Sequence, residues 1–149
     1  MKRILPFLLV FLVVFTGCGD DDDVSPLEEA EAMLQGEWQS VSVQYEIYRF
    51  DKSELLGSGT TSVNELGLTF TPDSVTFIHY RVFGGNILSS TTEELQLIER
   101  TGKRYLMLQT EEYEMIRLDR DNLQLMRIFN LGDPLTVREQ TFTYNRVKW

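Results

Sequence analysis

The feature that most constrains this chain is an alternation of apolar and polar residues with a period of two, from Trp38 almost to the end of the sequence. Residues 41–47 show it clearly, since valine, tyrosine and isoleucine alternate there with serine, glutamine and glutamate. Successive side chains of a β-strand point to opposite faces, so the pattern predicts strands with one buried face. Clusters of Gly, Pro, Asn and Asp separate these segments as tight turns do. The predicted strands are 38–47, 66–70, 75–83, a long segment ending near 98, 104–110, 113–118, 123–130 and 136–147.

Eight consecutive strands joined mostly by tight turns predict an antiparallel up-and-down meander. A meander of this length removes its open edges by curling into a barrel, and eight strands enclose either packed side chains or one small ligand. We therefore expect an all-β, eight-stranded barrel. A two-sheet β-sandwich is the alternative fold.

A short helix is predicted ahead of the strands. Ser25 and Glu28 match a capping box, Pro26 suits the first helical position, and Gly36 can close the far end. Leu27, Ala30, Met33 and Leu34 fall near one face, which we expect to be buried. The helix and the strands form one predicted domain over residues 25–149, long enough to bury a core without a disulfide.

The first 24 residues predict export and lipidation. Lys2 and Arg3 precede an apolar run of 12 residues, Ile4 to Phe15, and Gly17 stands before Cys18, the only cysteine. Twelve residues are too few for a transmembrane helix, which needs about 20. The stretch resembles the lipobox of bacterial lipoproteins, which implies a signal peptide over residues 1–17 and acyl chains on Cys18. An ordinary secretory signal that leaves a free thiol is the alternative.

The net charge of the chain argues against some classes of binding partner. Residues 18–24 contain four consecutive aspartates and predict a hydrated tether, which also resembles the acidic tag of some surface-exposed Gram-negative lipoproteins. The chain has 14 basic and 23 acidic residues, and loss of Lys2 and Arg3 leaves 12 against 23, a net charge of −11. A chain so acidic is a poor match for nucleic acid or anionic lipid. We expect attachment to the outer membrane through the acyl chains, with possible exposure at the cell surface.

The sequence offers little for catalysis or metal binding. His79 is the only histidine, so a site with several histidines is excluded, and a structural role in its strand is favoured over a catalytic one. No nucleophile elbow, phosphate loop or dinucleotide fingerprint is present. Residues 119–122 lack the glycine and the distant glutamate of a calcium loop and predict a turn. We therefore expect no enzyme, no metal and no cofactor.

Three short motifs carry a family resemblance. The segment 34–38 with Gly36 and Trp38, the hairpin residues 68–73, and the paired segments 113–116 and 123–125 resemble the lipocalin-like domains of small bacterial lipoproteins. In that family a Gly-x-Trp follows a short helix, and the resemblance implies that Trp38 packs across the closed end of a barrel.

Two function hypotheses follow from these observations. The favoured one is a non-enzymatic module that binds a small apolar or amphipathic ligand, and the other is an interaction subunit whose filled barrel docks on an envelope protein. Residues 51–62 predict either a lid over the barrel mouth or a plain surface loop. The predicted ligand-wall residues are Tyr45, Phe77, Tyr80, Phe142 and Tyr144.

Overall fold

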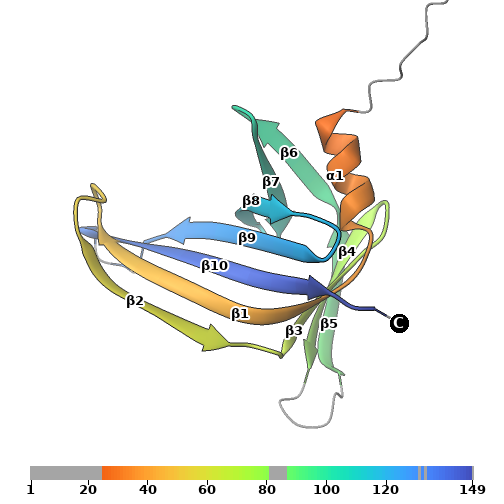
Figure 1. The fold of residues 1–149 in the computed structure, drawn as a ribbon, viewed down its shortest axis with the longest axis horizontal. Helices are drawn as coiled ribbons and strands as arrows, with labels where there is room; N and C mark the ends of the chain where they lie inside the picture. Colours follow the sequence, from red (N-terminus) through yellow and green to blue (C-terminus); the bar gives the residue numbers. More distant parts are fainter. Residues whose placement is uncertain (1–24, 81–86, 131, 133, 149) are drawn as a thin grey trace, which may run out of the picture.

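The computed structural model describes residues 25–80, 87–130, 132 and 134–148. They form one helix and ten β-strands (Figure 1). The elements are α1 (Pro26–Leu34), β1 (Gly36–Arg49), β2 (Leu55–Ser62), β3 (Leu66–Phe70), β4 (Ser74–Tyr80), β5 (Ile87–Glu94), β6 (Gln96–Arg100), β7 (Lys103–Leu108), β8 (Glu111–Leu118), β9 (Asn122–Phe129) and β10 (Thr136–Arg146).

All ten strands belong to one antiparallel sheet. Their spatial order is β5-β4-β3-β1-β10-β9-β8-β7-β6, and β2 also pairs with β1. The sheet ends, β5 and β6, are joined in the chain by Leu95 alone, so the sheet curls round a single core as a half-barrel (Figure 1). The meander of the sequence-based prediction is confirmed, and the arrangement is one curled sheet, not the two-sheet sandwich.

The predicted number of eight strands is too low for two reasons: β2 forms within residues 51–62, where a lid or a loop was predicted, and the long predicted segment is divided in two. β2 and β3 pair in succession with one side of β1, at residues 42–48 and 36–39. Between them the Ser40 hydroxyl donates to the Val63 carbonyl at 2.7 Å and accepts from the Leu66 amide at 3.2 Å. Leu95 divides the long predicted segment into β5 and β6.

The predicted helix is present with its predicted cap. The Ser25 hydroxyl accepts from the Glu28 amide, and the Glu28 carboxylate accepts from the Ser25 amide, which completes the capping box. Ala30 and Leu34 are fully buried, and α1 packs against β6 and β8. The C-cap is Gln35, whereas Gly36 begins β1 with φ +109°, a conformation that favours glycine.

Trp38 closes the end of the half-barrel that carries α1. Its side chain is 1% exposed, and its indole Nε1 donates to the Leu34 carbonyl at 2.7 Å. The Arg146 guanidinium carbon lies 4.2 Å from the centroid of the indole ring, and its terminal nitrogens donate to the carbonyls of Met33 and Gln35. One arginine of the last strand therefore holds both the tryptophan and the end of the helix.

A bulge in β1 changes which residues face the core. The pairing of β1 with β10 shifts between Ser40 and Ser42. As a result Trp38 and Val43, which have opposite parity in the sequence, are both buried, and Val41 is 38% exposed. The sequence had grouped Val41 with Val43, and the bulge separates them.

Residues 51–62 are neither a lid nor a plain loop. Residues 55–62 form β2, which pairs with β1 from Ser62 opposite Ser42 to Leu55 opposite Tyr48. The strand was missed because its sequence has no apolar alternation. The positions opposite Tyr45 and Ile47 are Gly59 and Gly57, and the side chain of Tyr45 lies over Gly59.

β4 carries apolar residues on both faces. Phe77 packs against the core, and the pairing of β4 with β5 shifts between His79 and Tyr80. Tyr80 then lies against Gly67, on the face opposite to Phe77. The predicted residues 81–83 of this strand, and the turn predicted after it, lie outside the described residues.

The strands differ greatly in length, and this shapes the molecule. β1 has 14 residues and β10 has 11, whereas β6 has 5 and β7 has 6. At about 3.3 Å per residue the long strands run past the short wall by roughly 15–30 Å. They continue to the left in Figure 1 as a curved sheet of β2, β1, β10 and β9. The core occupies the other end, where Leu106, Leu123 and Leu125 are fully buried.

The signal peptide predicted over residues 1–17, the lipidated Cys18 and the acidic tether all lie outside the described residues. Within the described part of the chain, no helix has the length and apolarity needed to cross a membrane.

We predict that Trp38→Ala lowers the free energy of unfolding by about 3–5 kcal/mol, because it removes a buried ring and leaves a cavity. Urea unfolding followed by circular dichroism measures the change. Phe50→Ala is the control, since Phe50 is 65% exposed and its loss should cost less than about 0.5 kcal/mol. A loss below about 1 kcal/mol for Trp38→Ala would contradict the closure described above.

Candidate ligand-binding site

The extended strands bring a set of aromatic and basic side chains to the inner face of the sheet. Phe142 and Leu125 are paired residues of the core, and two steps along the same strands stand Gln140 and Arg127. A further two steps bring Arg138 opposite Phe129. Side chains two residues apart in a strand share a face. The core face therefore continues into a group that we call the arginine cluster: Tyr45, Tyr113, Arg127, Phe129, Arg138 and Phe142.

Arg127 is the best-connected member of the arginine cluster. Its guanidinium donates to the Glu111 carboxylate at 3.0 Å, to the Tyr113 hydroxyl at 3.3 Å and twice to Gln140 Oε1 at 3.1 and 3.2 Å. The guanidinium carbon also lies 4.9 Å from the ring centroid of Phe129. Burial raises the pKa of the Tyr113 phenol above its usual value, so this group stays protonated and polar at neutral pH.

Arg138 stands in a different position. Its guanidinium carbon is 4.6 Å from the ring centroid of Tyr45 and 5.9 Å from that of Phe129. Its Nε is buried and has no hydrogen-bond partner, and no described carboxylate forms an ion pair with it. Thr136 lies two residues before Arg138 on the same face of β10, and its buried hydroxyl also has no hydrogen-bond partner. Buried polar groups without partners are uncommon and costly.

The inner face is open beside Arg138. Gly57 pairs with Ile47, which in turn pairs with Arg138 on the other side of β1. A Cβ atom placed on Gly57 would meet nothing within 4 Å. The glycine therefore leaves free space on the inner face, next to the aromatic and basic side chains of the arginine cluster.

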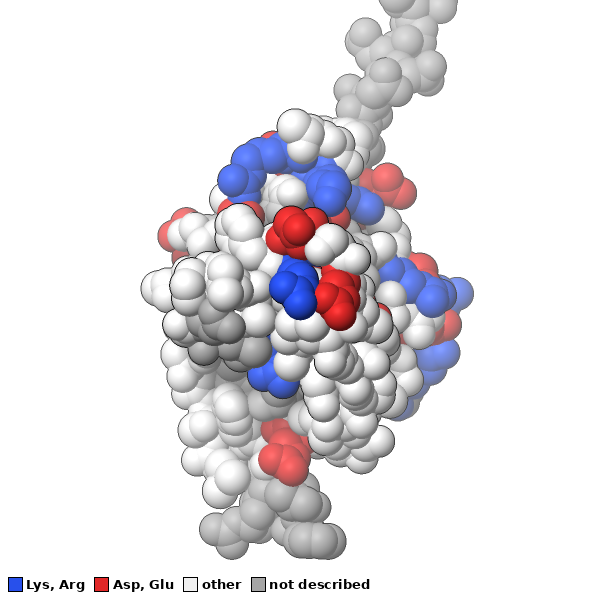
Figure 2. Space-filling model, turned by 90° about the vertical axis from the view of Figure 1, so that its left-hand side faces the viewer, with Lys and Arg blue, Asp and Glu red and all other residues white. Residues whose placement is uncertain are grey.

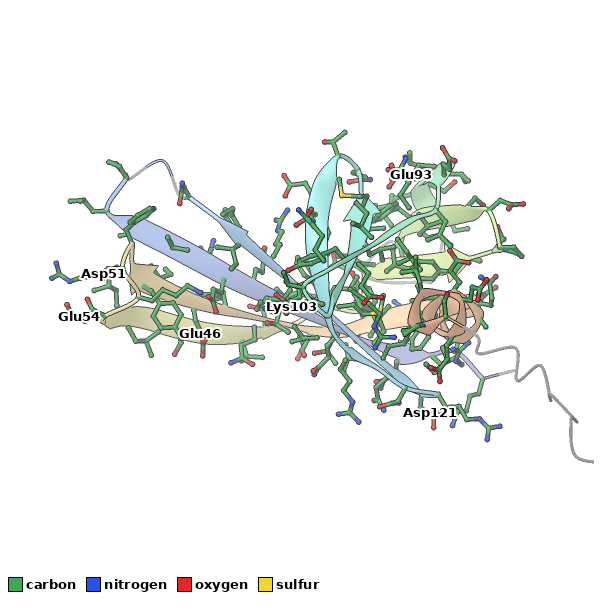
Figure 3. The ribbon with its side chains drawn as sticks, turned by 90° about the horizontal axis from the view of Figure 1, so that it is seen from above. Glu46, Asp51, Glu54, Glu93, Lys103 and Asp121 are labelled. Atoms are coloured by element: carbon green, nitrogen blue, oxygen red, sulfur yellow. The ribbon has the colours of Figure 1, made fainter. Side chains whose placement is uncertain are left out.

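Two clefts lie along the short strands, and most of the residues that line them point to the outer face of the sheet. One has a volume of about 450 Å³ and lies where β8 and β9 separate beyond their pairing of Glu114 with Met126. Its lining includes Arg127 and Glu111, so the ion pair between them borders it, together with Lys103. The other, of about 380 Å³, adjoins the junction of β5 and β6 and includes Glu93. Lys103 and Glu93 are labelled in Figure 3.

The structure brings together only part of the predicted ligand wall. Tyr45 and Phe142 belong to the arginine cluster. Tyr144 is 5% exposed in the core, where burial raises the pKa of its phenol, and Phe77 packs against the core from β4. Tyr80 lies on the opposite face of β4 from Phe77, over Gly67.

The arginine cluster contains residues that the sequence analysis did not select: Arg127, Arg138, Tyr113 and Phe129. The sequence contains a signal for two of these residues, Arg127 and Arg138. In β9 an arginine has the parity of the core residue Leu125, and in β10 an arginine has the parity of Phe142. A charged residue on the buried parity of a strand is unusual and marks a position for inspection.

Other predicted features have ordinary structural roles. His79 is exposed on β4. Residues 119–122 form a turn, in which the Asp119 carboxylate accepts from the amides of Asp121 and Asn122 and from Arg117. These hydrogen bonds, with one from the Asn122 side chain, hold the pKa of Asp119 far below its usual range. Among the described residues, no group of three His, Cys, Asp or Glu side chains is arranged to hold a metal.

The described residues form a half-barrel sheet with a helix across one end. Comparison with solved structures finds a lipocalin-like protein from Bacteroides uniformis, 13% identical over 77% of this chain and 99% of that one, with a TM-score of 0.43. An uncharacterized protein from Bacteroides eggerthii is 10% identical over 76% and 99% of the two chains, with a TM-score of 0.43. Lobster apocrustacyanin A1 is 9% identical over 78% and 62%, with a TM-score of 0.40. No protein-family model and no curated protein matches the sequence.

We predict different costs for the two partners of the Arg127–Glu111 ion pair. Arg127→Met should lower the free energy of unfolding by about 1–3 kcal/mol, because it leaves partly buried partners such as Gln140 unsatisfied. Glu111→Gln should cost less than about 1 kcal/mol, because the carboxylate side chain is 52% exposed. Urea unfolding of both variants tests the contrast. Equal costs would show that Arg127 acts only through its ion pair.

Proposed function

We propose that this protein is a lipid-anchored module of the cell envelope that binds a small apolar or amphipathic ligand on the inner face of its half-barrel. The observation that carries the proposal is the arginine cluster. It extends the core face beyond the filled core, beside free space at Gly57. Ligand sites combine apolar and aromatic walls with a few polar groups.

Binding fits the described chemistry better than catalysis. The polar groups of the arginine cluster are guanidinium, phenol and amide groups, which orient a ligand, whereas Arg127 already has a carboxylate partner. The single histidine is exposed and does not belong to the cluster. We therefore assign the protein a non-enzymatic role.

The anchor is the part of the proposal that depends on the sequence before residue 25. The basic start, the short apolar run and Cys18 support cleavage after residue 17 and acylation of the thiol. More than one acyl chain makes such attachment durable. The aspartates after Cys18 then separate the folded body from the membrane, and we place the protein at the outer membrane with its body directed away from the lipid.

A second candidate function is docking on an envelope protein, and one observation favours it. At the tip of the extended strands Phe50 is 65% exposed and Leu135 is 72% exposed, and the Phe50 amide donates to the Leu135 carbonyl at 2.9 Å. Leu55 and Leu56, nearby in β2, are 52% and 47% exposed. Figure 2 views this end of the molecule, where uncharged side chains surround a small group of basic and acidic ones. Exposed apolar patches often mark interaction sites.

Native mass spectrometry of the protein extracted from its own cells tests the binding proposal. We expect a small molecule to accompany the natural protein, and Gly57→Leu to remove it by filling the inner face. Ser58→Leu is the matched control, because Ser58 is exposed, lies one residue along and points to the other face. Absence of any ligand from repeated preparations would favour docking as the function. Retention of the ligand in Gly57→Leu would place it elsewhere.

We predict that Cys18→Ala abolishes acylation and releases a folded body from the membrane. Intact mass and membrane fractionation measure the two effects, and circular dichroism checks the fold. Unchanged membrane retention would show that another attachment holds the protein.

A further inference from the structure

We infer that the ligand of the inner face carries an oxyanion head group, such as a carboxylate, which pairs with Arg138, while its apolar part lies along Tyr45 and the free space at Gly57. This inference rests on the proposed function and specifies the chemistry of the ligand. The first observation is an unbalanced positive charge on Arg138. The chain has more acidic than basic residues, yet this half-buried arginine has no carboxylate partner among the described residues.

Other arginines have acceptors for their hydrogen bonds. Arg49, Arg100, Arg117 and Arg127 form ion pairs with Glu54, Glu112, Asp119 and Glu111, and Arg146 of the same strand, which forms no ion pair with a described residue, donates to backbone carbonyls. The Arg138 guanidinium contacts the faces of aromatic rings, and its Nε remains buried without an acceptor. A buried donor without an acceptor costs free energy, and the cost is larger for a charged group. An oxyanion that accepts from the guanidinium group would offset part of that cost.

The groups around Arg138 also favour an anion as its partner. Its guanidinium carbon and that of Arg127 lie 5.9 and 4.9 Å from the ring centroid of the same phenylalanine, Phe129. Two positive groups so placed repel each other, and Glu111 contacts only one of them. An anion at Arg138 balances the second charge. Guanidinium and carboxylate groups match in geometry and form bidentate hydrogen bonds, which makes a carboxylate the head group that fits best.

The residues around Arg138 also indicate the chemical character of the rest of the ligand. The ring of Tyr45 lies against Arg138 on one side of β1 and over Gly59 on the other, so it forms an apolar floor. Gly57 and Ile47 continue this floor with free space above the glycine. A molecule with an acid at one end and an apolar body therefore fits in one direction, with its charge toward β10 and its body toward β2.

A matched pair of probes tests this inference. The full chain carrying Cys18→Ser, which has no acyl chains to compete, is titrated with dansylated undecanoic acid and with its uncharged methyl ester, and dansyl fluorescence reports binding. We expect the acid to bind at least about tenfold more tightly than the ester, the size expected for a hydrogen bond to a charged group. Arg138→Met should remove the preference by weakening binding of the acid more than binding of the ester, and Arg138→Lys should restore part of it.

The controls separate the possible failures. Arg117→Met removes the same charge from an exposed arginine and should keep the preference for the acid. Thermal unfolding without ligand should show Arg138→Met as stable as the natural chain or more so, because the change removes a buried unpaired group. Equal binding of acid and ester would overturn this inference and leave the proposed function standing. Failure of both probes to bind would overturn the two together.

Discussion

The contact among Trp38, Arg146 and the end of α1 is the constraint on which the rest of the structure depends. The indole ring lies under the guanidinium and donates to the Leu34 carbonyl, while the same guanidinium donates to carbonyls at the end of the helix. Charged hydrogen bonds and a desolvated cation–π contact are among the stronger polar interactions in proteins. Helix, first strand and last strand are therefore joined at one point, which fixes where the sheet begins its curl.

That closure also divides the molecule into two parts with different tasks. Near Trp38 the strands of both walls are present, and leucines such as Leu106 and Leu123 fill the space between them. Further along, the short strands end and the long ones continue, so their inner face has no opposite wall of the same length. Packing of the core stabilises the end near Trp38. The other end can therefore carry polar and aromatic side chains that the core does not need.

The sequence predicted the path of the chain well and the site poorly, for physical reasons. Capping residues, tight turns and the period of two are local signals, so α1 and most of the strands were found where they lie. β2 was missed because Gly57 and Gly59 occupy its inner positions and leave no alternation to detect. The bulge at Val41 reversed the inward parity, which no local signal reports. Arg127 and Arg138 look equivalent in the sequence, and only the fold shows that Glu111 reaches one of them.

The position of the unpaired groups is itself informative. Arg138 Nε and Thr136 Oγ1 stand on the same face of β10, two residues apart, in the part of the strand beyond the core. A chain with 23 acidic residues had many ways to place a carboxylate beside them. Proteins commonly break local rules of polar satisfaction at functional sites and compensate elsewhere in the structure. Here the filled end around Trp38 supplies the compensation, which allows the open end to keep a guanidinium that no described carboxylate neutralises.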